Sequence, residues 1–172
     1  EIAAADAIVG GLLDHLRQLG VYDRAIVIVT SDHGEGLGNH GEDQHSILLY
    51  REAIQVPLLL KLPRNLRAGE LVKEPAQLAD ILPTVAELVG IPAPKTSSGR
   101  SLLKLGEDGV GPRSLYAETL YPRLHLGWSE LRSVVDGRWH YVSGPRPELY
   151  DLAKDPRETT DLLAREPGPS ER

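Results

Sequence analysis

The residues best suited to chemistry lie in one polar segment, which begins at Asp32-His33. Asp32 offers a hard carboxylate oxygen and His33 an imidazole nitrogen, and together they suit a divalent cation. Residues 32–45 hold three histidines and four acidic residues, so His40 and His45 add two groups that could donate to an anion. Two ligands are too few to hold a cation alone. The alternative is a plain turn, in which Asp32 caps backbone N–H groups and His33 is half exposed.

The elements before and after this segment must position it. Residues 25–30 form an apolar, β-branched run without alternation, which predicts a parallel strand buried on both faces. Ligands of open α/β sheets bind outside the carboxyl ends of such strands, which is where Asp32 and His33 stand. Residues 2–19 show helical spacing of apolar residues, and residues 56–62 predict a second buried strand. This order indicates an α/β sheet.

The pattern changes towards the C-terminus. A helix over residues 80–89, with Asp80 as its N-cap, is followed by a loop rich in Pro, Ser and Gly. Then come consecutive strand signals without helices between them, and Asp136-Gly137 favours a hairpin turn. The expected strands are 114–119, 131–135, 138–142 and 148–152. We therefore expect two domains, 1–110 from an α/β fold and 111–172 as a small antiparallel sheet.

The bulk composition excludes several classes of function. A formal charge of −6 argues against nucleic acid as a partner, because phosphate binding needs clustered Lys and Arg. The chain has no cysteine, so no disulfide framework or thiol chemistry is proposed. No apolar run approaches the roughly 20 residues of a membrane span, and no signal peptide is visible. The chain begins at Glu1 inside an expected helix, so we expect a fragment.

The wider pattern of motifs resembles the sulfatase family of the alkaline phosphatase superfamily. The motifs follow the family's order along nearly the whole chain: Thr30-Ser31-Asp32-His33-Gly34-Glu35, Leu37-Gly38-Asn39-His40-Gly41, Val56-Pro57-Leu58, Asp80-Ile81-Leu82-Pro83-Thr84, Gly99-Arg100-Ser101-Leu102, Glu148-Leu149-Tyr150-Asp151-Leu152 and Glu158-Thr159. The resemblance implies part of an alkaline-phosphatase-like α/β/α sandwich, followed by a small antiparallel sheet subdomain with a C-terminal helix. It also implies a sulfuric ester hydrolase.

The resemblance further implies a metal site. Sulfatases hold a divalent cation, usually Ca²⁺ (Mn²⁺ or Zn²⁺ being possible), with four protein side chains besides the nucleophile. Asp32 and His33 match the second pair of these ligands. The first pair and the nucleophile, a formylglycine made from Cys or Ser, belong to the N-terminal half of the family's fold. Nothing here matches those motifs, so we expect an incomplete C-terminal part of the enzyme.

His45 is the main departure from the family's pattern. Sulfatases commonly carry a Lys there, which contacts the sulfate ester, whereas this chain has Gln44-His45-Ser46. We expect His45 to hydrogen-bond an ester oxygen or to protonate the leaving group. A solvated loop histidine is the alternative, while His40 and Glu35 are interpreted as residues that order the loop.

Several functions stay open at this stage. The expected substrate is a small anionic ester, such as a sulfated sugar or an aryl sulfate. One alternative is a phosphodiester or phosphonate monoester hydrolase, or a phosphoethanolamine-type transferase, of the same superfamily. A second alternative is a non-catalytic binding module. The family's habit favours an extracytoplasmic location, periplasmic or secreted, and the oligomeric state is left open.

A first prediction concerns the 172 residues taken alone. With only two of the family's protein ligands present, they should neither bind Ca²⁺ at micromolar concentration nor turn over a sulfate ester, because a hydrated cation gives up water only for several converging oxygens. Calorimetric titration and an arylsulfatase assay measure both. Micromolar binding, or activity above that of an Asp32→Ala control, would contradict the prediction.

Overall fold

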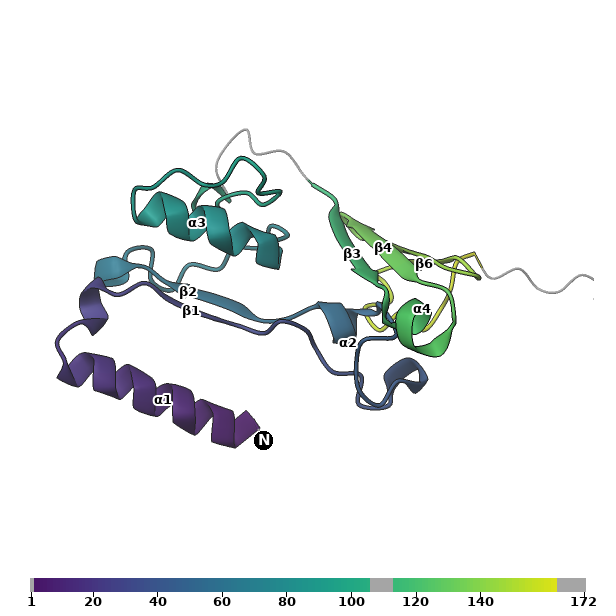
Figure 1. Ribbon diagram of the computed structural model, residues 1–172, viewed down its shortest axis with the longest axis horizontal. Helices are drawn as coiled ribbons and strands as arrows, with labels where there is room; N and C mark the ends of the chain where they lie inside the picture. The colour runs from purple at the N-terminus through teal and green to yellow at the C-terminus, as the bar shows by residue number, and fades with distance from the viewer. Residues whose placement is uncertain (1, 106–112, 164–172) are drawn as a thin grey trace, which may run out of the picture. The chain divides into compact units, whose positions relative to one another are not determined.

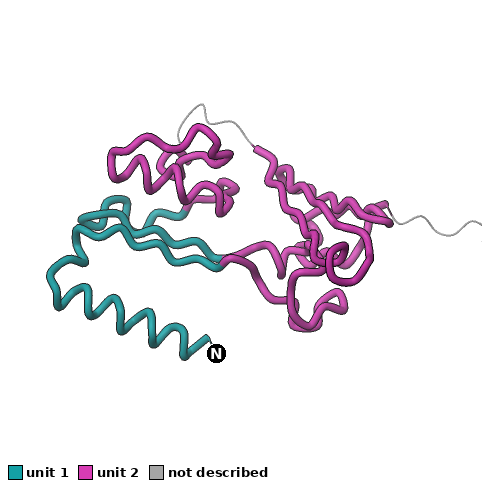
Figure 2. The backbone as a smooth tube through the Cα atoms, viewed as in Figure 1, with its two compact units in different colours: residues 1–31, 57–71 teal, residues 32–56, 72–172 magenta. Residues whose placement is uncertain are grey.

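The computed structural model of the chain describes residues 2–105 and 113–163 (Figure 1). Two compact units make up the chain (Figure 2). Unit 1 comprises residues 1–31 and 57–71, and unit 2 comprises residues 32–56 and 72–172. The predicted domain boundary at residues 110 and 111 lies outside the described residues, so the division into domains stays a prediction. Within the described parts of the chain, none of the helices has the length and apolar character needed to cross a membrane.

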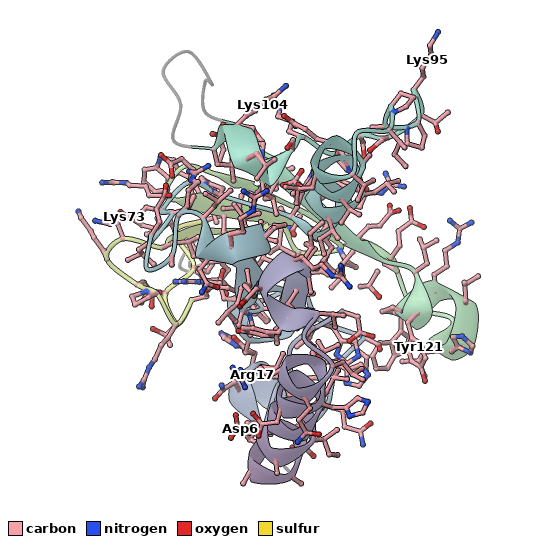
Figure 3. All side chains as sticks on the ribbon, turned by 90° about the vertical axis from the view of Figure 1, so that its left-hand side faces the viewer. Asp6, Arg17, Lys73, Lys95, Lys104 and Tyr121 are labelled. Atoms are coloured by element: carbon pink, nitrogen blue, oxygen red, sulfur yellow. The ribbon has the colours of Figure 1, made fainter. Side chains whose placement is uncertain are left out.

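Unit 1 joins a long helix to a pair of strands. Its elements are α1 (Ile2–Gln18), η1 (Tyr22–Arg24), β1 (Val27–Thr30), β2 (Leu58–Lys61) and η3 (Pro63–Asn65). The predicted helix is confirmed. Gly20 follows its end with a φ of 66°, in the left-handed region that favours glycine. Arg17 pairs with Asp14 one turn earlier at 2.7 Å. Figure 3 shows Asp6 and Arg17 among the charged side chains of α1.

The parallel orientation predicted for the strand at residues 25–30 is wrong for its pairing with the second strand. β1 and β2 pair antiparallel, with Val27 opposite Lys61 and Thr30 opposite Leu58. They are not buried on both faces either, since Leu59 is 59% exposed and Val29 36% exposed. An unbroken apolar run shows that a strand has apolar side chains on both faces, but it does not fix the direction of the neighbouring strand. The ammonium of Lys61 instead closes the pair against η1, donating to Tyr22 O at 2.7 Å and to Ala25 O at 3.1 Å.

Unit 2 contains the small antiparallel sheet that the sequence predicts. Its strand order is β3-β4-β5-β6, and every neighbouring pair is antiparallel. The strands are β3 (Leu115–Thr119), β4 (Leu131–Asp136), β5 (Trp139–Ser143) and β6 (Glu148–Asp151), and α4 (Tyr121–Leu126) joins β3 to β4. Gly137 makes the predicted hairpin turn with a φ of 57°. One face of the sheet is buried through Ser133, His140, Val142 and Tyr150.

The predicted C-terminal helix does not begin within the described residues. After β6 the chain continues in turns as far as Leu163, and residues 164–172 lie outside the described part of the chain. The other elements of unit 2 are η2 (Asn39–Gly41), α2 (Arg51–Ile54), η4 (Leu78–Asp80), α3 (Ile81–Leu88) and η5 (Leu102–Lys104). Lysines such as Lys73, Lys95 and Lys104 extend away from the fold into solvent (Figure 3).

Asp80 has a larger role than the N-cap that the sequence predicts. It is fully buried, and its carboxylate accepts hydrogen bonds from the N–H of Gln77 at 2.9 Å and the N–H of Arg100 at 2.8 Å. The guanidinium of Arg113 pairs with the same carboxylate, with one contact at 2.8 Å. Asp80 therefore caps η4 and ties α3 to the segment that leads into β3, instead of capping α3 with its side chain.

Hydrogen bonding sets the ionisation of this carboxyl. Burial alone would raise the pKa of Asp80, but the hydrogen bonds from Arg113, Arg100 and Gln77 outweigh it and hold that pKa below its ordinary value. A lowered folded-state pKa stabilises the fold above the ordinary pKa of about 3.9, and this stabilisation is lost as the pH falls through the lower folded value.

Asp80→Asn should therefore lower the free energy of unfolding by about 3 kcal/mol at pH 7, because it leaves the Arg113 guanidinium without its buried counter-charge. The difference from the unsubstituted chain should shrink as the pH falls below about 4. Urea unfolding at pH 7 and pH 3 measures both effects. Asp136→Asn, at an exposed position of β4, is the matched control. A loss no larger than the control's, or one independent of pH, would contradict this account.

Candidate active site

The loop that carries the candidate site is pinned to α2 through its backbone. The N–H of Gly34 donates to Ala53 O at 2.8 Å, and the N–H of Glu35 donates to Glu52 O at 2.9 Å. A Cβ on Gly34 would stand 1.9 Å from the carbonyl oxygen of Glu52, so only glycine permits this approach. Gly36 is similar, since its Cβ would meet the carbonyl oxygen of Glu42 at 2.2 Å.

A buried carboxylate shapes the second half of the loop. Glu42 is 7% exposed, and its two oxygens accept hydrogen bonds from the N–H groups of Ile47 at 2.8 Å and Leu48 at 3.0 Å. Glu42, before His45, is thereby joined to the backbone after it, and these hydrogen bonds close the turn that carries His45. Thr119 at the end of β3 also donates its hydroxyl to the carbonyl of Ser46, a residue with a φ of 88°.

Asp32 and His33 follow β1 with only Ser31 between, and their polar atoms lie close together. His33 Nε2 is 3.7 Å from Asp32 Oδ1. Two ligands that each bind a cation at about 2.0–2.6 Å stand at most about 5 Å apart, so this spacing fits a shared cation. His33 Nδ1 lies 2.8 Å from Gly34 O, which can only accept. Nδ1 must therefore carry the proton, and Nε2 is the nitrogen whose lone pair suits a metal.

His45 stands against this pair. Its ring stacks on the ring of His33, with centroids 3.8 Å apart and 25° between the planes. Its Nδ1 lies 3.3 Å from Glu35 Oε1. Asp32, His33, Glu35 and His45 therefore form one group, here called the Asp32–His45 cluster. Among the described residues, no three His, Cys, Asp or Glu side chains converge closely enough to hold a metal ion by themselves.

His40 lies outside the Asp32–His45 cluster and orders the loop. Its Nδ1 pairs with the carboxylate of Glu52, its Nε2 lies 3.0 Å from Glu158 O, and its ring stacks on Tyr50 at 3.8 Å. These contacts agree with the structural role predicted for it. Burial alone would lower the pKa of His40, but its hydrogen bonds to the Glu158 carbonyl and the Glu52 carboxylate outweigh burial and raise that pKa. A raised pKa suits an imidazolium that donates from both nitrogens.

The sequence gives no sign of two long-range interactions, one buried and one partly buried. Glu158 is 1% exposed, and its carboxylate pairs with the fully buried His140 of β5 and accepts from the N–H of Arg51 at 2.7 Å. Tyr50 donates its hydroxyl to Glu148 at 2.6 Å, and burial together with this hydrogen bond raises the pKa of Tyr50 to about 12. The partners are up to 107 residues apart, so no local pattern reveals them.

An open cleft lies beside His40 and contains no member of the Asp32–His45 cluster. Its lining residues are Asn39, His40, Arg51, Glu52, Gln55, Tyr150, Pro156, Arg157, Glu158, Thr159 and Asp161. Some of its polar groups already pair with one another, as His40 does with Glu52 and Arg51 with Gln55. The donor chemistry of Asp32, His33 and His45, and not the cleft, therefore identifies the candidate site.

The family model for sulfatases matches residues 1–91, which is more than half of the chain. The chain belongs to the sulfatase family. The predicted resemblance is thus confirmed. Arylsulfatase K of Bos taurus is 33% identical over 96% of this chain, and N-acetylglucosamine-6-O-sulfatase of Bacteroides thetaiotaomicron is 28% identical over 95% of it. This sulfatase chain spans about a third of these relatives, 32% and 31% of their lengths.

Solved structures confirm the fold class, an α/β fold with a small β-subdomain. A protein solved in complex with its substrate D-glucosamine-2-N,6-O-disulfate superposes with a TM-score of 0.84 at 25% identity, covering 95% of this chain and 35% of its own. The phosphonate monoester hydrolase of Agrobacterium radiobacter superposes with a TM-score of 0.79 at 29% identity, covering 94% of this chain and 35% of its own.

Glu42→Ala should loosen the turn that carries His45. The N–H groups of Ile47 and Leu48 would lose their acceptors, which should lower the free energy of local opening by about 1–3 kcal/mol. Amide hydrogen exchange at these two positions should then be about ten- to a hundredfold faster. Asp43→Ala, next to it in sequence but exposed, is the control and should leave both rates unchanged. Equal protection in the two variants would show that the Glu42 carboxylate does not hold the turn.

Proposed function

We propose that this chain forms part of a metal-dependent hydrolase of sulfate esters, with sulfated sugars as the substrate class. The placement of the ligand pair Asp32 and His33 beside the stacked ring of His45 carries the proposal, because an anionic ester needs a cation and a hydrogen-bond donor next to its oxygens. Membership of the sulfatase family supports the reaction type. The substrate class is supported by two similar proteins, one named as an N-acetylglucosamine-6-O-sulfatase and one solved with a disulfated glucosamine.

In this proposal Asp32 and His33 hold a divalent cation, most simply Ca²⁺. Asp32 supplies a hard oxygen. His33 supplies the lone pair of Nε2, because its Nδ1 carries the proton that is donated to Gly34 O. Once bound, such a cation neutralises charge on the ester oxygens and favours ionisation of a nucleophile. The rest of the ligand set and the formylglycine nucleophile would come from sequence beyond these 172 residues. The polypeptide that carries both is called the complete enzyme below.

His45 is the residue proposed to touch the ester. Because its ring stacks on His33 at 3.8 Å, a substrate oxygen next to the ligand pair lies within reach of the His45 imidazole. A protonated ring nitrogen can donate a hydrogen bond to that oxygen or pass its proton to the leaving oxygen, which departs as the alcohol. Charge that develops on the leaving oxygen is stabilised by a donor held in place before the reaction begins.

The identity of residue 45 favours a second candidate, a phosphonate or phosphate ester hydrolase. Histidine stands where the family's resemblance leads us to expect lysine, and a phosphonate monoester hydrolase is among the similar structures. The chemistry is related, since both ester classes present anionic oxygens to the same groups. The two candidates differ in which ester the complete enzyme turns over faster.

Turnover of an aryl sulfate and of an aryl phosphonate ester by the complete enzyme separates the candidates. We expect the higher kcat/KM for the sulfate. Asp32→Ala should lower kcat/KM by about a hundredfold or more for both esters, because it removes a cation ligand that several kcal/mol of stabilisation depend on.

Asp43→Ala is the matched control for Asp32→Ala, since it removes an exposed carboxylate of the same loop. A higher kcat/KM for the phosphonate would replace the sulfatase proposal by the second candidate. Full activity in Asp32→Ala, or no turnover of either ester by the unsubstituted enzyme, would refute the assignment of the site.

A further inference from the structure

Glu35 is the one member of the Asp32–His45 cluster to which the proposed function gives no task. Its backbone is held against α2 by the hydrogen bond from its N–H to Glu52 O at 2.9 Å, so α2 sets the point from which its side chain extends. Its carboxylate oxygen Oε1 lies 3.3 Å from Nδ1 of His45, ten residues later. Both side chains are partly exposed, His45 to 35% and Glu35 to 44%.

The chemistry of the contact determines which nitrogen of His45 carries a proton. An ionised carboxylate can only accept a hydrogen bond, so Nδ1 of His45 must be the donor. In the neutral imidazole, a proton on Nδ1 leaves the lone pair on Nε2, so Nε2 is the nitrogen that takes up the second proton. In the resulting imidazolium, Nδ1–H donates to Glu35 and Nε2–H is the donor that faces the ester. The orientation of the ring is then limited from two sides, by Glu35 at its Nδ1 and by His33 against its face.

We propose that Glu35 is the positioning residue for His45, holding its Nδ1–H so that Nε2 is the nitrogen presented to the ester. The inference rests on the proposed function for its meaning, since it assigns the tautomer and orientation of the group that meets the substrate. Glu35 itself touches neither the ester nor the reacting atoms. Its effect on turnover must therefore pass through His45.

Backbone contacts hold both segments that carry the Glu35–His45 contact. Glu42 closes the turn that carries His45 through Ile47 and Leu48, and Gly34 permits the close approach that places Glu35 on α2. The donor and the acceptor are thus each held by separate backbone contacts. A hydrogen bond between two positions fixed in advance loses little conformational entropy when it forms.

Imidazole ¹⁵N spectroscopy tests the inference without any assay of activity. At about pH 9, above the ordinary imidazole pKa of about 6.5, the complete enzyme should show His45 protonated at Nδ1, with the signals assigned by their loss in His45→Gln. Glu35→Ala should shift His45 towards the Nε2–H form. Glu35→Gln keeps a carbonyl oxygen as acceptor and should retain the Nδ1–H form. Asp43→Ala, which removes another carboxylate of the same loop, should change nothing.

A kinetic cycle tests the consequence for turnover. Glu35→Ala should lower kcat about tenfold with little change in KM, and the same substitution in a His45→Ala background should have no further effect. An Nε2–H tautomer in the unsubstituted enzyme, or one unchanged by Glu35→Ala, overturns the inference, and so do additive losses in the cycle. The spectroscopic result stands even if neither ester is turned over, so failure of the proposed function and failure of this inference are distinguishable.

Discussion

The pairing of the buried Glu158 carboxylate is the interaction on which the candidate site depends. It pairs with His140 of β5 and accepts from the N–H of Arg51 at the start of α2, while the carbonyl of Glu158 meets His40 of the loop. A buried carboxylate needs its hydrogen-bond partners, here His140 and the N–H of Arg51, because the loss of either leaves a buried polar oxygen unsatisfied. The small sheet, α2 and the loop are therefore held as one body.

The geometry of the candidate site depends on α2, whose first residue, Arg51, is bound by Glu158. α2 supplies the two carbonyls that accept from Gly34 and Glu35, and this places Glu35 opposite His45. Glu42 then closes the turn around His45 from the other side. The chemistry of the cluster thus depends on backbone contacts that need glycine at positions 34 and 36, where any side chain would meet a carbonyl oxygen.

Local sequence patterns predicted much of this fold. The rest is determined by pairing between distant segments, which local patterns do not reveal. The strand signals of residues 131–135 and 138–142, with the Asp136-Gly137 turn between them, predicted the β4–β5 hairpin, and the spacing of apolar residues predicted α1. Residues 25–30 were predicted as a parallel strand, whereas β1 pairs antiparallel with β2, because an apolar run does not fix the direction of the neighbouring strand. Asp32, His33 and His45 could be singled out by residue type, whereas the contact between Glu35 and His45 depends on the path of the loop. The partners of Asp80 and Glu158 could not be predicted, since they come from distant segments.

The central claim is that Asp32 and His33 bind a divalent cation. Anomalous diffraction from crystals of the complete enzyme grown with Mn²⁺ tests it most directly. We expect a single strong peak within about 2.0–2.6 Å of both an Asp32 carboxylate oxygen and His33 Nε2, with His45 beside it but not bound to it. A peak bound to other residues, or a fully occupied site that leaves Asp32 and His33 uncoordinated, would contradict it.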